Sequence, residues 1–223
     1  MTSTAGSLAV AKSVHLDFEV AGTQVWWTDL GSDSAHGAVG HDVLVTLLAR
    51  FIDRDPATVL FARDRWGKPH LVGEPGVHFN LSRSRSQLVV AIGRRPVGVD
   101  IEVVRHVPER AALTALHLAP GERREVLRAD EHRRDELFLV AWTRKEACAK
   151  AIGAGLRIPP ASIESGAGRQ LVRTAIHFQN AEYVVEVESS LAAAHAVVSL
   201  AALVTGEAPM RARKDPLRQK RWM

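Results

Sequence analysis

The sequence Trp142-Thr143-Arg144-Lys145-Glu146-Ala147-Cys148-Ala149-Lys150 lies at the centre of the longest predicted helix, which runs from Asp135 to Ile152. Apolar residues recur there at helical spacing, and Glu146 follows Trp142 by one turn on the same inward stripe. A carboxylate on that stripe costs free energy unless it is paired or binds a metal, and burial would shift its pKa towards the working range of a base. Lys150 follows one turn later and could reach the same ligand. The alternative is a solvated Glu–Lys pair, which leaves the stripe position of Glu146 unexplained.

Acidic and apolar residues alternate in Val97-Gly98-Val99-Asp100-Ile101-Glu102. In a strand, Asp100 and Glu102 would share one face and stand about 6–7 Å apart, with the apolar residues on the other face. Gly98 lies on the acidic face and leaves space beside the two carboxylates. The pattern suits a hard divalent cation that also meets a ligand phosphate. The alternative is a half-buried strand whose acids face solvent.

A third group of residues has the chemistry of a phosphate-binding surface. Arg63 precedes the turn Gly67-Lys68-Pro69, which could present its lysine, and Asn80 to Ser86 alternates hydroxyls with guanidiniums. Hydroxyl donors and arginine forks are good phosphate ligands. The alternative is an exposed polar strand end.

The rest of the chain combines strand and helix patterns, so the sequence predicts an α+β protein. Alternating or apolar runs predict strands at 14–27, 78–81, 88–92 and 97–101, and a closing sheet within 170–206. Helical spacing predicts helices at 41–52, 109–118 and 121–127, and Gly153 ends the long helix.

Composition narrows the function classes. The chain has 223 residues and a formal net charge of +4, which favours anionic partners. Its single cysteine, Cys148, excludes an intrachain disulfide and a multi-cysteine metal site. The first 14 residues lack the apolar core of a signal peptide, and no stretch of 18 apolar residues occurs, so we expect a cytoplasmic protein without membrane spans.

In their order along the chain, these motifs resemble the surfactin-synthetase-type 4'-phosphopantetheinyl transferases. The resemblance rests on Gly67-Lys68-Pro69, Phe79-Asn80-Leu81-Ser82-x-Ser84, the strand 97–102, and Trp142-x-x-Lys145-Glu146-Ala147-x-x-Lys150. It implies a fold of two pseudo-twofold-related α/β subdomains with the ligand cleft between them. The halves would be residues 13–104 and 109–206, followed by a basic flexible tail at 207–223.

The resemblance also implies an activity and its residues. A family member transfers the 4'-phosphopantetheine group of coenzyme A to a serine of an acyl or peptidyl carrier protein, releases adenosine 3',5'-bisphosphate, and acts as a monomer. Glu146 and Lys150 would be catalytic, and Mg²⁺ would be held by Asp100, Glu102 and Glu146. Coenzyme A would be bound by Lys68, Ser82, Arg83, Arg63 and Lys145. The carrier, of fatty-acid, polyketide or nonribosomal-peptide type, would be acidic where it meets this basic chain.

Two departures from the family pattern keep alternatives open. Arg83 stands where the family has histidine, and the stretch Ala35-His36-Gly37-Ala38 lacks the arginine expected before the first helix. A relative that binds coenzyme A or carrier protein without turnover is therefore the second hypothesis. A third is nucleic-acid binding through the basic residues after Pro209, although no recognised binding motif accompanies them.

Overall fold

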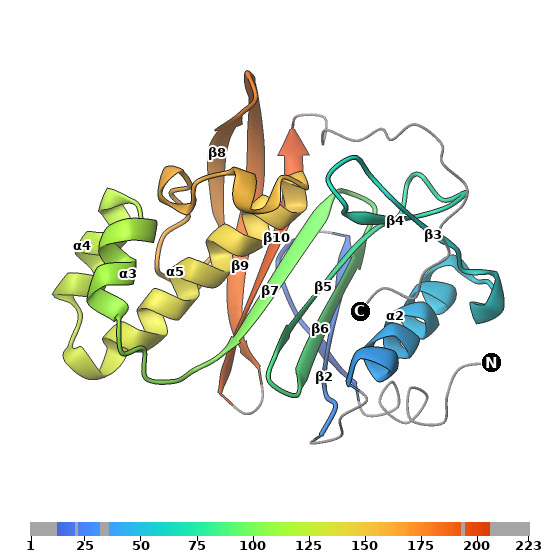
Figure 1. Cartoon of the computed structure of the whole chain (residues 1–223), viewed down its shortest axis with the longest axis horizontal. Coiled ribbons are helices and arrows are strands. Elements are labelled where there is room, and N and C mark those ends of the chain that lie inside the picture. Colours follow the sequence, from blue (N-terminus) through green and yellow to red (C-terminus); the bar gives the residue numbers. More distant parts are fainter. Residues whose placement is uncertain (1–12, 21, 32–35, 193–194, 206–223) are drawn as a thin grey trace.

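The computed structural model describes residues 13–20, 22–31, 36–192 and 195–205, and within these ranges the chain has the predicted α+β fold (Figure 1). Two four-stranded antiparallel sheets lie side by side, in the orders β1-β2-β6-β5 and β7-β10-β9-β8, and β3 and β4 form a separate hairpin. The basic tail predicted at 207–223 lies outside the described residues.

The first sheet and helix α2 form one apolar core. The strands are β1 (Val14–Leu16), β2 (Thr23–Asp29), β5 (His78–Ser84) and β6 (Gln87–Gly93), and α2 spans His36–Ile52. Leu44 and Leu48 of the helix pack with Leu88 and Ile92 of β6, which is buried along its whole length. The hairpin of β3 (Phe61–Arg63) and β4 (Pro69–Leu71) lies beyond the far end of α2 in Figure 1.

The second sheet carries the longest helix. Its strands are β7 (Val97–Val103), β8 (Val172–Phe178), β9 (Ala181–Ala192) and β10 (Ala196–Thr205), and α5 (Glu131–Ile152) crosses its face (Figure 1). Helices α3 (Arg110–His117) and α4 (Pro120–Arg128) pack beside the N-terminal part of α5, and short 3₁₀ turns at 155–157 and 160–162 follow its C-terminal end.

Most of the predicted elements are found with longer bounds, α3 is slightly shorter than predicted, and one expected strand is divided. The strand-like stretch 14–27 becomes β1 and β2, while α2 and α5 begin several residues before their predicted starts. Helix α5 ends as predicted, because Gly153 adopts the left-handed conformation (φ 86°) and its N–H donates to the carbonyls of Ala149 and Lys150. No helix in the described part of the chain is long and apolar enough to cross a membrane.

Strand β7 joins the two halves of the molecule. The division predicted at residues 104–109 assigns β7 to the first half, yet its backbone pairs with β10, so hydrogen bonding places it in the second sheet. Its other neighbour is β5, which contributes side-chain hydrogen bonds rather than a backbone ladder: the Val99 N–H donates to Asn80 Oδ1 (2.8 Å). The backbone hydrogen bonds of β7 therefore put the boundary between the two sheets before this strand. The division into two subdomains at 104–109 stays a prediction.

Helix α5 lies unusually close to β7, and Gly98 makes this possible. A Cβ atom at Gly98 would stand 2.1 Å from the Ala147 carbonyl oxygen and 2.4 Å from the Ala151 nitrogen. These are backbone atoms in the middle of a packed helix, so they cannot move aside without displacing α5. The glycine thus sets the distance between the strand that carries Asp100 and the helix that carries Glu146.

We expect Gly98→Ala to lower the free energy of unfolding by about 3 kcal/mol or more, because the added methyl group overpacks a backbone contact. Chemical denaturation followed by circular dichroism measures this loss. Gly76→Ala is the matched control, since a Cβ there meets no atom within 4 Å. Equal stabilities of the two variants would contradict the close approach.

Candidate functional site

The candidate site lies where β5, β7 and α5 meet. Alternation along β7 directs Asp100 and Glu102 to the same face, as predicted, and Asp100 is buried while Glu102 is half-buried. Ser82 and Ser84 of β5 point to these acids, and Glu146 and Lys150 of α5 approach from the helix side.

Asp100 has two polar partners that come from different elements. Its Oδ1 accepts hydrogen bonds from Ser82 Oγ (2.7 Å) and from Lys150 Nζ (2.6 Å), and Lys150 Nζ also donates to Ser82 Oγ (3.2 Å). Burial raises the pKa of Asp100, and the nearby Glu102 adds to this, whereas Lys150 and Ser82 oppose it. The structure therefore brings together Asp100, Ser82 and Lys150 as the sequence predicted.

Glu102 lies at the open side of the same cluster. Its Oε2 accepts from Ser84 Oγ (3.0 Å) and from Arg105 Nη1 (2.8 Å). The Ser84 hydroxyl oxygen also accepts the Val103 N–H (3.2 Å), so this side chain links β5 to β7. Neither Ser84 nor Arg105 was among the predicted site residues, although the period of two in Asn80-x-Ser82-x-Ser84 places all three side chains on one face.

Glu146 is the acid without a hydrogen-bonded partner in the described part of the chain. Its side chain is half-buried, and its pKa is raised by burial and by the charge of Asp100, against the opposing effect of Lys150. The alternative reading of a solvated Glu146–Lys150 pair is wrong, because the Lys150 ammonium binds Asp100 instead. An ionised Glu146 thus faces a second carboxylate with only part of its charge offset.

The three acids have the chemistry of a magnesium site, but in this structure their carboxylates do not converge on one point. Oxygen donors are the ligands of hard cations, and a cation would relieve the repulsion among Asp100, Glu102 and Glu146. Among the described residues, however, no three His, Cys, Asp or Glu side chains lie close enough together to hold an ion. Asp100 forms an ion pair with Lys150, and Glu102 forms one with Arg105. Metal binding by this cluster therefore stays a prediction.

The other predicted coenzyme A ligands lie away from this cluster. Arg83 is exposed on the opposite side of β5 from Ser82, and Arg63 Nη1 donates to the Gly67 carbonyl (2.6 Å) within the β3–β4 turn. Lys68 turns inward and donates to backbone carbonyls rather than presenting its ammonium to a ligand. For Lys68, the prediction of a phosphate contact is therefore corrected: a tight turn can aim a side chain into the protein as readily as outward.

The prediction for Lys145 is corrected for a similar reason. Its side chain is 1% exposed and its ammonium lies 2.5 Å from the fully buried Glu122 carboxylate. It also donates to the carbonyls of Pro160 and Ile163. Glu122, in the first turn of α4, is this buried counter-ion and also accepts the Ser165 N–H (2.8 Å). Lys145 directly precedes Glu146 in α5, yet its side chain points to a different face of the helix.

Arg144 reinforces this structural face of α5. It is fully buried, and its guanidinium donates to the carbonyls of Ser165 (2.7 Å), Gly168 (2.8 Å) and Val187 (3.1 Å). Arg144 and Lys145 together hold the loop after α5 against the helix and β9. Burial lowers the pKa of both groups, so their cationic forms depend on these acceptors.

Comparison with known proteins agrees with the site. Residues 96–200 match the family model of the 4'-phosphopantetheinyl transferase superfamily. A 4'-phosphopantetheinyl transferase of Bacillus subtilis is 30% identical over 128 residues, which cover 57% of this chain and 56% of that protein. The transferase HetI of Nostoc sp. is 30% identical over 121 residues (52% and 51%), and the transferase gsp of Aneurinibacillus migulanus is 29% identical over 127 residues (57% and 52%).

The region that matches contains β7 and α5, which carry the acidic residues of the site. The chain spans about half the length of the curated relatives it matches. These matches agree with the resemblance seen in the motifs: residues 96–200 are similar to the 4'-phosphopantetheinyl transferase superfamily, and about half of the chain is similar to the curated transferases.

We expect Lys145→Met to lower the free energy of unfolding by about 3–5 kcal/mol, because Glu122 is left as an uncompensated buried charge. Adding Glu122→Gln should recover part of that loss. Urea unfolding of the single and double variants measures both effects. Arg54→Met is the control: it breaks the exposed Arg54–Glu74 pair and should cost less than about 1 kcal/mol. A loss for Lys145→Met no larger than the control would refute the buried pair.

Proposed function

We propose that this protein transfers the 4'-phosphopantetheine group of coenzyme A to a serine of an acyl or peptidyl carrier protein and releases adenosine 3',5'-bisphosphate. The observation that carries the proposal is the meeting of Glu146 and Lys150 of α5 with Asp100 of β7 and Ser82 of β5. The relatives named 4'-phosphopantetheinyl transferase support it, since the matched region supplies three of these four residues.

Each residue of the cluster has a role that its surroundings suit. Glu146 accepts the proton of the carrier serine: its pKa is raised by burial and by Asp100, and among the described residues no hydrogen bond holds its carboxylate back. Lys150 supplies a positive charge next to the reacting phosphates, and the Ser82 hydroxyl donates to a phosphate oxygen. Arg83, exposed on the other side of β5 from Ser82, offers coenzyme A a guanidinium fork outside this cluster.

Asp100, Glu102 and Glu146 are the residues that would hold Mg²⁺. The bound ion offsets negative charge on the pyrophosphate, which lowers the barrier to phosphoryl transfer. The excess of carboxylates over cations around Asp100 supports this assignment, because burial and mutual repulsion raise the pKa of both Asp100 and Glu146.

The partner is proposed to be an acidic carrier protein of fatty-acid, polyketide or nonribosomal-peptide type, bound by a monomer. The net charge of +4 supports an electrostatic encounter with such a surface, and that encounter should weaken as salt is added. A cytoplasmic location remains an expectation that follows from coenzyme A and carrier proteins being the substrates.

The decisive assay incubates the protein with coenzyme A, Mg²⁺ and apo carrier proteins of the three types, and weighs each carrier by mass spectrometry. We expect one carrier or more to gain the mass of a phosphopantetheine group, and chelation of the metal to stop the reaction. Calorimetric binding of coenzyme A without any mass gain would instead support the non-catalytic alternative.

Glu146→Gln should abolish transfer and at the same time stabilise the fold at neutral pH. A carboxyl whose pKa is raised in the folded protein opposes folding when it is ionised, and this penalty is absent below the ordinary value of 4.5, where the group is protonated in both states. The variant should therefore melt a few degrees above the wild type at pH 7, with the difference vanishing in acid.

Differential scanning calorimetry between pH 4 and pH 8 measures the melting difference, and the carrier-mass assay measures the turnover. A variant that keeps near wild-type turnover would show that Glu146 is neither the base nor a metal ligand. A lower melting temperature at pH 7 would show that the carboxylate is compensated in the folded state.

A further inference from the structure

We infer that Lys68 is a positioning residue that holds the last turn of α5 against the start of β7 and so aims Lys150 at Asp100. The inference rests on the proposed function for its catalytic consequence and on the contacts of Lys68 for its structural part. It replaces the phosphate contact expected of this lysine.

The ammonium of Lys68 lies in a cage of three backbone carbonyls. It donates to the oxygens of Lys150 (2.5 Å), Val97 (3.1 Å) and Ala151 (3.4 Å). An ammonium has three N–H donors and no acceptor, so these three carbonyls use its full capacity. No donor is left for a ligand phosphate.

The cage joins segments that are distant in the sequence. Lys68 belongs to the β3–β4 hairpin, Val97 is the first residue of β7, and Lys150 and Ala151 lie in the last turn of α5. A cation at the C-terminal end of a helix interacts favourably with the helix dipole. The Lys68 ammonium adds to the bond that the Lys150 carbonyl already accepts from the Gly153 N–H (3.1 Å), and it ties the end of α5 to the first residue of β7.

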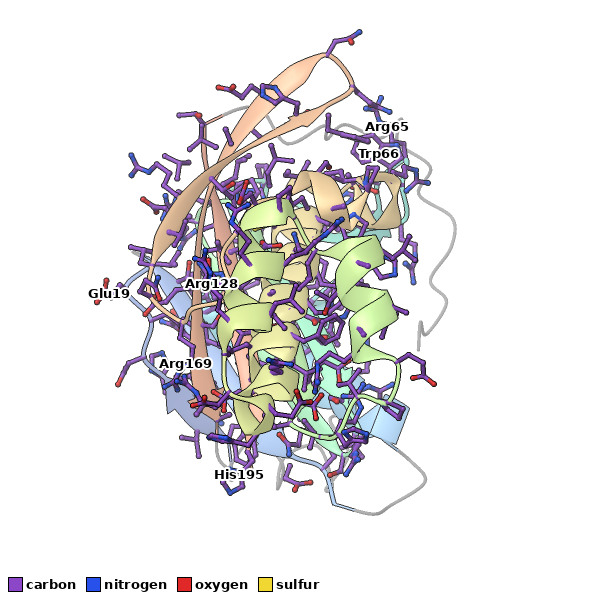
Figure 2. The ribbon with its side chains drawn as sticks, turned by 90° about the vertical axis from the view of Figure 1, so that its left-hand side faces the viewer. Glu19, Arg65, Trp66, Arg128, Arg169 and His195 are labelled. Atoms are coloured by element: carbon purple, nitrogen blue, oxygen red, sulfur yellow. The ribbon has the colours of Figure 1, made fainter. Side chains whose placement is uncertain are left out.

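The hairpin turn is built to direct Lys68 inward. The Asp64 carboxylate accepts the backbone N–H groups of Trp66 (2.8 Å) and Lys68 (2.9 Å), and Gly67 takes a positive φ of 87°. The lysine stem then runs along the end of the helix, because a Cβ at Gly153 would lie 3.5 Å from Lys68 Cδ. Neighbouring Arg65 behaves differently: it is exposed, its guanidinium carbon lies 4.4 Å from the Trp66 ring centroid, and Figure 2 shows both at the outer edge of the molecule.

The same residue, Lys150, links the cage to the site. Its carbonyl oxygen accepts from Lys68, and its own ammonium binds Asp100 Oδ1. Holding that carbonyl fixes the rotation of the last turn about the helix axis, and this rotation decides where the Lys150 side chain points. Without the cage, the end of α5 could fray and Lys150 would lose its fixed approach to Asp100.

One neighbouring group, His78, registers the charge of Lys68. Burial lowers the pKa of Lys68 to about 8, with Asp64 opposing the change. The pKa of His78, at the start of β5, is lowered to about 4 by burial and by the Lys68 charge. His78 is therefore a spectroscopic reporter of the cage that does not depend on catalysis.

The test compares wild type, Lys68→Met, Lys68→Arg and the control Arg65→Met, a neighbouring exposed cation outside the cage. Hydrogen exchange followed by mass spectrometry should show ~10-fold or faster exchange at residues 149–154 in Lys68→Met alone. In the same variant, NMR titration should show the His78 pKa moving up from its wild-type value near 4. Transfer kinetics should show kcat falling by ~10-fold or more with KM for coenzyme A changed much less, because the displaced group acts in the transition state. Lys68→Arg, which keeps the charge, should recover part of kcat.

Unchanged exchange at 149–154 in Lys68→Met would overturn the inference whatever the activity. So would an unchanged His78 pKa in Lys68→Met, because the charge of Lys68 contributes to the lowering. Faster exchange with an unchanged kcat would show that the cage stabilises the helix without positioning Lys150. A wild type that modifies no carrier would sink the proposed function, while exchange and the His78 titration would still decide the cage.

Discussion

The close contact between α5 and β7 is the constraint on which the rest of the molecule depends. Because Gly98 has no side chain, the helix backbone approaches the strand to a distance that any larger residue would block. That approach brings the acids of β7 within reach of two α5 residues one turn apart, Glu146 and Lys150. The site is thus a property of a backbone contact between two elements, and the charged residues are placed by it.

A second feature is the use of side chains where a sheet would use its backbone. Between β5 and β7, Asn80 accepts a backbone N–H, Ser82 binds Asp100, and Ser84 bridges Val103 and Glu102. These bonds connect the two sheets and orient the carboxylates at the same time. The cost is a cluster of partly buried like charges that disfavours ionisation, which is the usual tension between stability and function.

Three lysines around α5 show how little the residue type says about its role. Lys150 faces an acid in the site, Lys145 is an internal counter-ion for Glu122, and Lys68 satisfies carbonyls at the end of the helix. All three belong to the motifs that resemble the family, yet of the three only Lys150 contacts the acidic cluster. Burial and available acceptors separate the roles, since a buried ammonium must use every donor it has.

The sequence by itself determined the α+β class, most of the helices and strands, and the family resemblance, because periodicity and the order of motifs can be read along the chain. Alternation on a strand predicted that Asp100 and Glu102 share a face, whereas a shared metal site that includes Glu146 was implied only by the family resemblance and stays a prediction. The tertiary structure alone decided that β7 pairs with β10, that Lys68 and Lys145 point away from the ligand surface, and that Lys150 binds Asp100. Those outcomes depend on which carbonyls and carboxylates arrive from distant segments, and no local pattern encodes that.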